Sequence, residues 1–157
     1  MSQRHAPLKT KQAFERRLTY IAQNGLVLGQ LVLGREVPID TVTIFSQTDQ
    51  EYAKIAGFIR NYGPVSAVSH GDTLYIDTSF ELLSNLISYL GVRKPDPTRP
   101  EVGYVDFPVS DFTHLVSLCQ ESSFMQLITS GRGQPLIEIR HPNFDVRGYI
   151  VATEEHS

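Results

Sequence analysis

The sequence repeats one pattern of secondary-structure signals, and this repeat constrains the fold more than any other feature. The first copy starts at Thr41 with a β-branched run, continues with helical spacing as far as Gly63, and ends in two extended segments, VSAVSHG and TLYIDT. The second copy starts at Gly103 with GYVDFPV, continues with SDFTHLVSLCQ, and ends with FMQLITSGRG and PLIEIRH. A β-α-β-β pattern that occurs twice predicts two similar modules built side by side.

We therefore expect an α+β fold in which two β-α-β-β(-β) modules form one curved, mostly antiparallel sheet, with helices on its convex side and an accessory N-terminal helix. The expected boundaries are 1–37 for the N-terminal helix and loop, 38–98 for the first module and crossover, and 99–157 for the second module. A chain of 157 residues has the length of a single domain overall.

The N-terminal helix follows a frayed tail of residues 1–7 and is predicted to stop at Asn24-Gly25, because glycine ends helices in the left-handed conformation. The next segment, GLVLGQLVLG, is predicted to be a loop with a short extended piece, because its glycines interrupt a helix. Residues 79–91 fit a helix and a strand equally well.

Caps and turns divide the two modules. Thr48 and Glu51 form a capping box at the first module's helix, and Ser110 is expected to cap the helix of the second. Hairpin turns are predicted at residues 70–72, with glycine supplying the positive φ, and at residues 130–133. The proline-rich segment VRKPDPTRPEVG is predicted to be an extended crossover.

Composition excludes several classes of function. The net charge of −3 supplies no basic field, so nucleic acid is not an expected partner. The single cysteine, Cys119, forms no internal disulfide and is expected to be a buried, inert thiol. The sequence has no apolar run long enough for a membrane span and no apolar signal-peptide core, which predicts a cytoplasmic protein without membrane contact. Oligomeric state stays open, including a homo-oligomer.

Three segments carry a resemblance to a known family: PIDTVTI, GYVDFPV and IRHPNFDV, with the proline-rich crossover before the second. Together they resemble the vicinal-oxygen-chelate (glyoxalase-like) superfamily, and within it the YecM-type proteins, over roughly residues 14 to 155. The resemblance implies paired modules curling round a cleft, with the two opening strands facing each other. In active members that cleft holds a divalent metal that chelates vicinal oxygens of the substrate.

The chain departs from the family pattern where metal ligands are implied. Those positions hold Thr41, Leu90-Gly91, and Asp106 preceded by Val105. Only Asp106 keeps a good oxygen ligand, whereas a divalent site needs three or four converging side chains. We therefore expect no cofactor; the alternative is a divergent metal site made by Asp106, Glu138 and His141.

Strand alternation selects the candidate site residues. Tyr75 shares a sheet face with Asp77, and Glu138 shares one with Arg140. If these faces are concave, the carboxylates of Asp77 and Glu138 meet across a groove and work as acid and base; if they are convex, both face solvent. His141, beside a Pro-Asn turn, either donates to a ligand or satisfies local backbone groups.

The opening strands supply the other candidates, because alternation places Thr41, Thr43 and Phe45 on one face and Tyr104, Asp106 and Pro108 on another. Asp106 would anchor a ligand with a donor or cationic group; the alternative is a closed core in which backbone donors hold Asp106. The candidate ligand-binding residues are Thr41, Thr43, Tyr75, Asp77, Tyr104, Asp106, Glu138, Arg140 and His141.

The first functional hypothesis is a small-molecule-binding protein of glyoxalase-like fold without metal catalysis. The alternatives are a divergent metal-dependent lyase, isomerase or dioxygenase-type enzyme, and a protein-interaction module. The sequence identifies no ligand and leaves open whether the protein is an enzyme.

Overall fold

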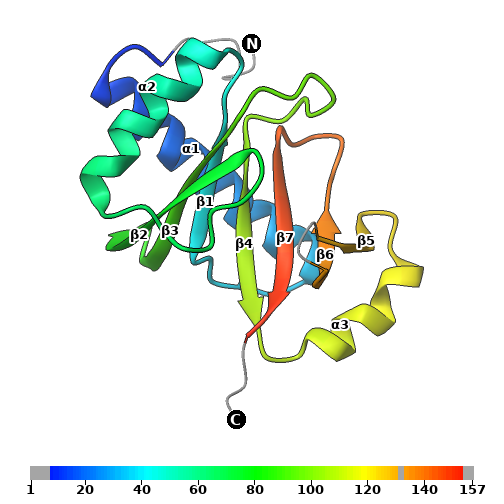
Figure 1. The fold of residues 1–157 in the computed structure, drawn as a ribbon. Coiled ribbons are helices and arrows are strands. Elements are labelled where there is room, and N and C mark those ends of the chain that lie inside the picture. Colours follow the sequence, from blue (N-terminus) through cyan, green and yellow to red (C-terminus); the bar gives the residue numbers. More distant parts are fainter. Residues whose placement is uncertain (1–7, 131–132, 154–157) are drawn as a thin grey trace.

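The computed structural model describes residues 8–130 and 133–153, which form an α+β fold with one open, mixed sheet. The sequence predictions for the tail at 1–7 and for the last four residues lie outside this range. The strand order is β2-β3-β1-β4-β7-β6-β5 (Figure 1). The elements are α1 (Lys11–Leu33), β1 (Thr41–Phe45), α2 (Asp49–Ile59), β2 (Thr73–Leu82), β3 (Asn85–Arg93), β4 (Gly103–Val109), α3 (Phe112–Leu118), β5 (Met125–Thr129), β6 (Pro135–Ile139) and β7 (Val146–Ala152).

The sheet is centred on the antiparallel pair β1–β4, in which Thr43 lies opposite Tyr104. On one side β3 runs parallel to β1, and on the other β7 runs parallel to β4. The outer strands β2, β6 and β5 each pair antiparallel with a neighbour. The expectation that the opening strands face each other across a cleft is therefore wrong: each has one edge occupied by its own half of the chain, and the two free edges pair side by side.

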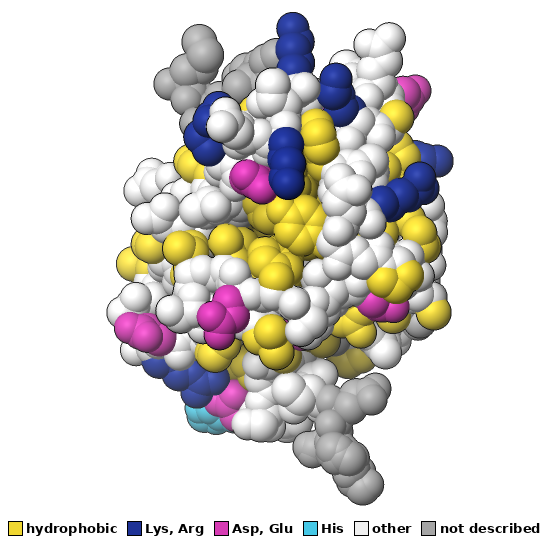
Figure 2. Space-filling view, turned by 90° about the vertical axis from the view of Figure 1, so that its left-hand side faces the viewer, with side chains coloured by type: hydrophobic (Ala, Val, Ile, Leu, Met, Phe, Trp, Pro, Cys, Tyr) yellow, Lys and Arg dark blue, Asp and Glu magenta, His cyan; other side chains and the backbone are white. Residues whose placement is uncertain are grey.

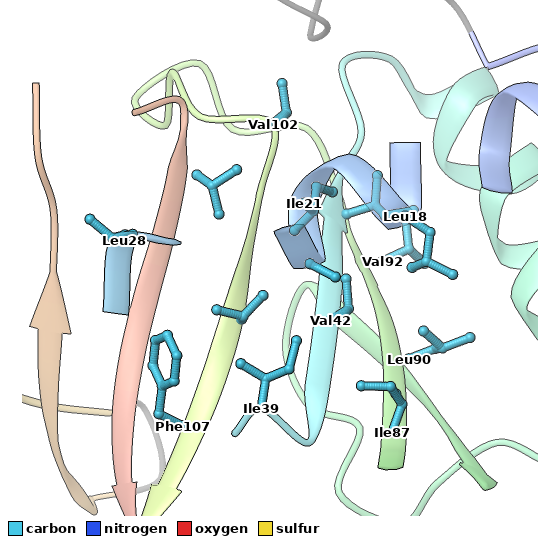
Figure 3. Packing of buried hydrophobic residues seen from close by; sticks show 14 of the residues in the cluster. Leu18, Ile21, Leu28, Ile39, Val42, Ile87, Leu90, Val92, Val102 and Phe107 are labelled. Carbon is cyan, nitrogen blue, oxygen red and sulfur yellow. The ribbon is translucent and has the colours of Figure 1, made fainter. Parts of the chain in front are cut away.

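All three helices bury their apolar side chains against the same face of the sheet. Helix α1 packs against β1, β4 and β7, α2 against β3, and α3 against β7. Figure 3 shows Leu18 and Ile21 of α1 among Val42 and Val92 of the sheet, all of them buried. The opposite face of the sheet is therefore not covered by these helices.

Helix α1 is longer than its sequence predicted. It continues through the expected stop at Asn24-Gly25 to Leu33, and it ends at Gly34 with φ 73°. The segment predicted to be a loop is thus helical, and the glycine that ends the helix lies nine residues beyond Gly25.

Two glycines inside α1 serve close packing instead of ending the helix. A Cβ atom added at Gly25 would lie 2.6 Å from Val105 Cγ2, and one at Gly29 would lie 2.6 Å from Phe107 Cζ. Glycine is therefore the residue that lets this helix approach β4. Tertiary packing here overrides the low helix propensity of glycine.

The capping box of α2 is confirmed, but the cap predicted for α3 is wrong. Thr48 Oγ1 accepts a hydrogen bond of 3.0 Å from the Glu51 N–H, and Glu51 in turn accepts one from the backbone just before the cap. Helix α3 begins one residue later than Ser110 would allow, with Asp111 at the cap position. The Asp111 carboxylate binds Arg35 at 2.9 Å, which ties the start of α3 to the end of α1.

The first half of the chain contains one strand fewer than predicted before its hairpin. Residues 64–70 form a loop with single bridges from Val65 to Ile76 and from His70 to Thr73. The predicted turn at 70–72 is confirmed, with Gly71 at φ 52°.

Residues 79–91, which fitted either structure, are strand. They belong to β2 and β3, joined by a two-residue turn in which Leu83 and Ser84 both have positive φ (52° and 67°). Such a turn matches the twist of paired strands. The turn lacks the glycine or asparagine that usually occupies such positions. The sequence therefore contains no signal for a hairpin, and residues 79–91 fitted a helix equally well.

In the second half, the strands fall where they were predicted. The Ser130 N–H donates to the Gln134 carbonyl at 2.8 Å and closes the β5–β6 hairpin; residues 131–132 of that predicted turn lie outside the described range. Cys119 is half-buried, and burial raises the pKa of its thiol, which keeps it protonated.

The side of the molecule that carries α2 and β2 has an apolar region at its centre. Figure 2 shows hydrophobic side chains gathered around a shallow hollow there. On this side the ring of Phe14 lies 5.3 Å from that of Phe58, and the ring of Tyr62 lies 5.1 Å from that of Phe80. These aromatic side chains close the end of the core between α1, α2 and β2. Within the described ranges, no helix is long and apolar enough to cross a membrane.

Candidate functional site

The sheet face opposite the helices carries Tyr75, Tyr89, Tyr104 and Tyr149, and we call it the tyrosine face. Strand register places its residues in two neighbouring rows across the sheet. The first row consists of Tyr75, Gly91, Thr43, Tyr104 and Arg147. The second row consists of Asp77, Tyr89, Thr41, Asp106, Tyr149 and Glu138.

Tyr75 and Tyr104 meet over the middle of the first row. Their hydroxyl groups form a short hydrogen bond, although two strands separate the residues. Gly91 makes this reach feasible: a Cβ atom there would lie 2.8 Å from the Tyr75 ring and 2.8 Å from Thr43 Oγ1. The Tyr75 ring therefore lies across β3 at its glycine.

The tyrosine pair stays protonated at neutral pH. Burial, with a contribution from the nearby Asp106 carboxyl, raises the pKa of Tyr75 to about 12. Burial also raises the pKa of Tyr104 well above its ordinary value. Thr43 Oγ1 is close enough to lower both pKa values slightly, yet it has no well-formed hydrogen bond to another described residue. The pair is a source of O–H donors and not of phenolate.

Asp106 occupies the centre of the second row, between Thr41 and Tyr149. Its side chain is half-buried by area, and no hydrogen bond joins its carboxyl to the other described residues. Burial among the surrounding strands, together with the neighbouring Asp40 carboxyl, raises the pKa of Asp106 well above its ordinary value. The alternative in which backbone donors hold Asp106 is therefore not what the fold provides.

Asp40 stands just before β1. Its Oδ1 accepts a hydrogen bond of 2.9 Å from the hydroxyl of Thr41, the residue that lies opposite Asp106. Burial also raises the pKa of Asp40. Two carboxyls thus share the surroundings of Thr41, which disfavours ionising both.

Beside the tyrosines, the face carries a buried ion-pair cluster. Arg147, only 5% exposed, binds Glu101 at 2.9 Å and Glu138 at 3.1 Å. The other oxygen of Glu101 binds Arg140 at 3.3 Å. Pairing of this kind satisfies charges that would otherwise be costly to bury.

Tyr149 lies next to Asp106 in the second row and belongs to the ion-pair cluster through its hydroxyl. Its hydroxyl accepts hydrogen bonds of 3.2 Å from Arg147 and of 3.2 Å from Arg99, and donates one of 3.3 Å to Glu138. Arg99 belongs to the crossover segment and lies over the ring of Phe45, 5.9 Å from its centroid. The crossover therefore covers one end of the tyrosine face.

A separate pocket of about 480 Å³ lies beyond the end of β6. His141 lines it, with its ring 4.5 Å from that of Phe124 and 5.4 Å from that of Phe144. The His141 Nδ1 accepts a hydrogen bond from the Asn143 N–H, so the turn uses this nitrogen locally. Arg140 and Glu101 also reach this pocket.

The structure therefore separates candidates that the sequence had grouped. Asp77 and Glu138 share a face, but five strand spacings, about 24 Å, lie between them, so they do not meet as acid and base. Asp106 and Glu138 are two strands apart, about 10 Å, with Tyr149 between them. The other candidates on the face are Thr41, Thr43, Tyr75, Tyr104 and Arg140, while His141 lies in the turn beyond β6.

The residues present do not fit the divalent metal that the family resemblance implies. Thr41 and Asp106 are neighbours on the tyrosine face, but Leu90 is fully buried in the core on the other side. Among the residues that the structure describes, no three His, Cys, Asp or Glu side chains gather closely enough to hold a metal ion. Asp106 alone does not make such a site.

Several residues of the face escaped the sequence argument: Asp40, Tyr89, Gly91, Arg99, Glu101, Arg147 and Tyr149. Alternation along VRGYIVA could have placed Arg147 and Tyr149 on one face. The roles of Gly91 and Glu101 depend on contacts between segments far apart in the chain, which local patterns do not contain.

No protein-family profile matches the chain, and no curated protein does either. Among solved structures, the fold is similar to one titled "Structural Genomics, Protein EC4020", with a TM-score of 0.66 and 9% identity over 94% of each chain. A hypothetical protein BH1468 from Bacillus halodurans C-125 gives a TM-score of 0.48 at 10% identity, over 78% of this chain and 99% of that one. At 9% identity, the first likeness shows a shared fold and nothing about function.

Proposed function

We propose that this chain is a small-molecule-binding protein of glyoxalase-like fold that works without metal catalysis, and that its ligand binds on the tyrosine face at Asp106. The observation that carries the proposal is the carboxyl of Asp106, half-buried at the centre of the face and hydrogen-bonded to none of the described residues. A carboxyl whose pKa is raised and that no other described residue binds is a candidate functional group.

The surroundings of Asp106 suit a ligand site. Tyr104 packs edge-on against Tyr149, with ring centroids 5.0 Å apart, and tilted against Phe45 at 5.7 Å. Aromatic walls with a few oriented hydrogen-bonding groups are typical of small-molecule sites. Phe45, Tyr104 and Tyr149 are themselves buried as one apolar cluster of the fold.

The same proposal includes an internal duplication, with residues 41–78 and 103–141 as related units. It is supported by the matching pairings of the strand that follows each unit: β3 runs parallel to β1 and antiparallel to β2, and β7 runs parallel to β4 and antiparallel to β6. The halves differ where β5 has a loop, residues 64–70, as its counterpart. A ligand at Asp106 lies beside the β1–β4 pairing, where the two proposed units join.

A metabolite screen read by thermal shift tests the binding site. Asp106→Asn keeps the size of the side chain but removes the acid, and the matched control is Asp77→Asn, in the same row at the exposed edge. We expect both variants to fold, and ligands that stabilise the parent protein and the control to lose their effect on Asp106→Asn. A screen without any stabilising compound, combined with a large loss of stability in Asp106→Asn, would assign Asp106 a structural role instead.

Elemental analysis of protein purified without chelators distinguishes the enzyme alternative. We expect less than stoichiometric zinc, nickel and manganese, because three or four converging ligands are the usual requirement. One tightly held metal per chain would favour a divergent metal enzyme.

A further inference from the structure

The sheet is open and therefore has two edge strands, β2 and β5 (Figure 1). The outer edge of β2 is covered by the loop before it: the Ser66 N–H donates to the Tyr75 carbonyl at 2.8 Å, and the Asp77 N–H donates to the Pro64 carbonyl at 2.9 Å. Strand β2 also has a register shift between Asp77 and Phe80. Covering segments and irregularities of this kind keep a sheet edge from pairing with another chain.

Strand β5 has none of these protections. Its sequence, MQLIT, contains no charged residue and no proline. Its ladder with β6 continues without a register shift. Among the residues that the structure describes, no backbone hydrogen bond from another segment reaches its outer edge. An uncharged strand with an uncovered edge is a template for pairing with a further strand.

The hydrogen bonds at the two ends of β5 show which backbone groups point toward β6. The Arg140 N–H donates to the Phe124 carbonyl at 3.0 Å, just before the strand begins. The Ser130 N–H donates to the Gln134 carbonyl at 2.8 Å, just after the strand ends. Phe124 and Ser130 therefore both direct their backbone groups inward.

The residues between them alternate in direction. In an antiparallel ladder every second residue bonds to the same neighbour, so Gln126 and Ile128 also bond toward β6. The N–H and C=O groups of Met125, Leu127 and Thr129 therefore point to the open edge. Leu127 is 47% exposed, so an apolar side chain lies in solvent at the centre of this edge.

We propose that β5 pairs antiparallel with the same strand of a second copy of this chain, about a two-fold axis at Leu127. In this register Leu127 exchanges N–H···O=C bonds with the partner's Leu127, and Met125 exchanges them with the partner's Thr129. The outward-facing residues are symmetric about Leu127, so the outward donors of each copy meet acceptors of the other. The two sheets then form one continuous sheet.

The composition of β5 favours a copy of itself as the occupant. The register places Gln126 opposite the partner's Ile128, so no like charges meet although each chain carries a net charge of −3. An acidic or basic peptide, by contrast, would find no charged partner in the strand. The inference is separate from the proposed function, because Asp106 lies on β4 and two strands, β7 and β6, separate β4 from β5.

Sedimentation velocity of the full chain over about 1 to 500 μM measures the proposed dimer. Stable interfaces usually bury about 1,200 Å² or more, and the pairing of one short strand buries less. We therefore expect a dimer that dissociates in the micromolar range.

Two substitutions at Leu127 test the pairing. Leu127→Lys places two ammonium groups opposite each other, and Leu127→Pro removes an outward N–H without removing a bond to β6. We expect each to raise the dissociation constant of the dimer by about tenfold or more. The matched control is Leu86→Lys, because Leu86 is 59% exposed and lies on β3; this variant should dimerise like the parent.

Circular dichroism checks that the variants fold, and Leu127→Lys carries the test if Leu127→Pro does not fold. Amide hydrogen exchange, followed by NMR, shows whether the backbone edge is used. The amides of Met125, Leu127 and Thr129 should exchange more slowly as the concentration of the parent rises. In Leu127→Lys their exchange should not depend on concentration.

Each outcome supports or overturns the pairing. A parent that is monomeric over the whole concentration range overturns it and leaves the edge to a strand of another protein. A dimer that both Leu127 variants leave unchanged also overturns it, because another surface then holds the copies together. If Leu127→Lys dissociates the dimer while Leu127→Pro does not, and the outward amides stay unprotected, the copies meet through side chains and strand pairing is wrong.

Discussion

At the scale of single residues, the raised pKa of Asp106 makes a prediction that needs no ligand. An aspartate in an unfolded chain titrates near 3.9, and the folded protein raises this pKa. Between the two values the folded state binds more protons than the unfolded state, so the contribution of Asp106 to stability is full at low pH and is lost as pH rises. Asp106→Asn removes this loss.

We therefore expect the free energy of unfolding of Asp106→Asn, relative to the parent, to increase as pH rises from about 4. Urea unfolding at a series of pH values measures the difference, and Asp77→Asn controls for the lost charge. A difference that is flat, or that decreases with pH, would show that the fold does not favour the protonated acid.

The ion pairs of the chain give a second prediction at this scale. Glu101 is 8% exposed and binds both Arg147 and Arg140, so Glu101→Gln leaves the buried Arg147 short of a charged partner. Removing one partner of a buried pair costs about 3 kcal/mol. The comparison is Asp111→Asn, which breaks the more exposed pair with Arg35 and should cost less than about 1 kcal/mol. Equal losses in denaturant unfolding would contradict the structural role of the cluster.

Alternation along strands located most of the candidate residues, because a period of two assigns a face once the strand is known. It placed Tyr104 and Asp106 correctly together, and Tyr75 with Asp77. It could not tell which residues would touch across the sheet. The contact between Tyr75 and Tyr104 depends on strand order and on Gly91, and the distance from Asp77 to Glu138 depends on strand order alone.

At the scale of elements, α1 shows why local signals mislead. Glycine costs helix stability relative to alanine, so a sequence reading ends the helix at Gly25. The structure continues it because Gly25 and Gly29 contact β4, a fact that only the assembled sheet supplies. By contrast, the capping box of α2 is made by residues close in sequence, and it was predicted correctly.

The two kinds of helical glycine predict opposite effects of alanine. Gly57 in α2 has open space around its added Cβ, so Gly57→Ala should stabilise the protein by about 0.5–1 kcal/mol. Gly25→Ala gains the same propensity, but its Cβ meets Val105 at 2.6 Å, and overpacking a well-filled core costs about 1–3 kcal/mol. We expect a net loss of stability at Gly25. Urea midpoints that rise in both variants would contradict the close helix–sheet contact.

At the scale of the whole molecule, the repeat in the sequence predicted the α+β class but not the arrangement of its halves. The opening strands were expected to face each other, and they instead pair in one sheet. Helix α1, which precedes both halves, packs against β1 of the first and against β4 and β7 of the second. Sequence periodicity predicts individual helices and strands. Whether the two halves can fold independently depends on the contacts between those helices and strands, which periodicity does not contain.

This arrangement predicts that the protein unfolds as one unit. The β1–β4 ladder and α1 are shared, so fragments 38–98 and 99–157 would each lose the ladder partner and the α1 surface that covers β1, β4 and β7. Small single domains with one core usually unfold in a single transition.

The chain has seven tyrosines and no tryptophan. Near-ultraviolet circular dichroism therefore reports the packing of the tyrosines, while the far-ultraviolet signal reports the backbone. We expect the two urea transitions to coincide, and fragments 38–98 and 99–157 to be unfolded when each is produced alone. Two separate transitions, or a fragment 99–157 with native-like strand signal, would show that each half folds without the other, and the shared ladder would then be only a docking surface between them.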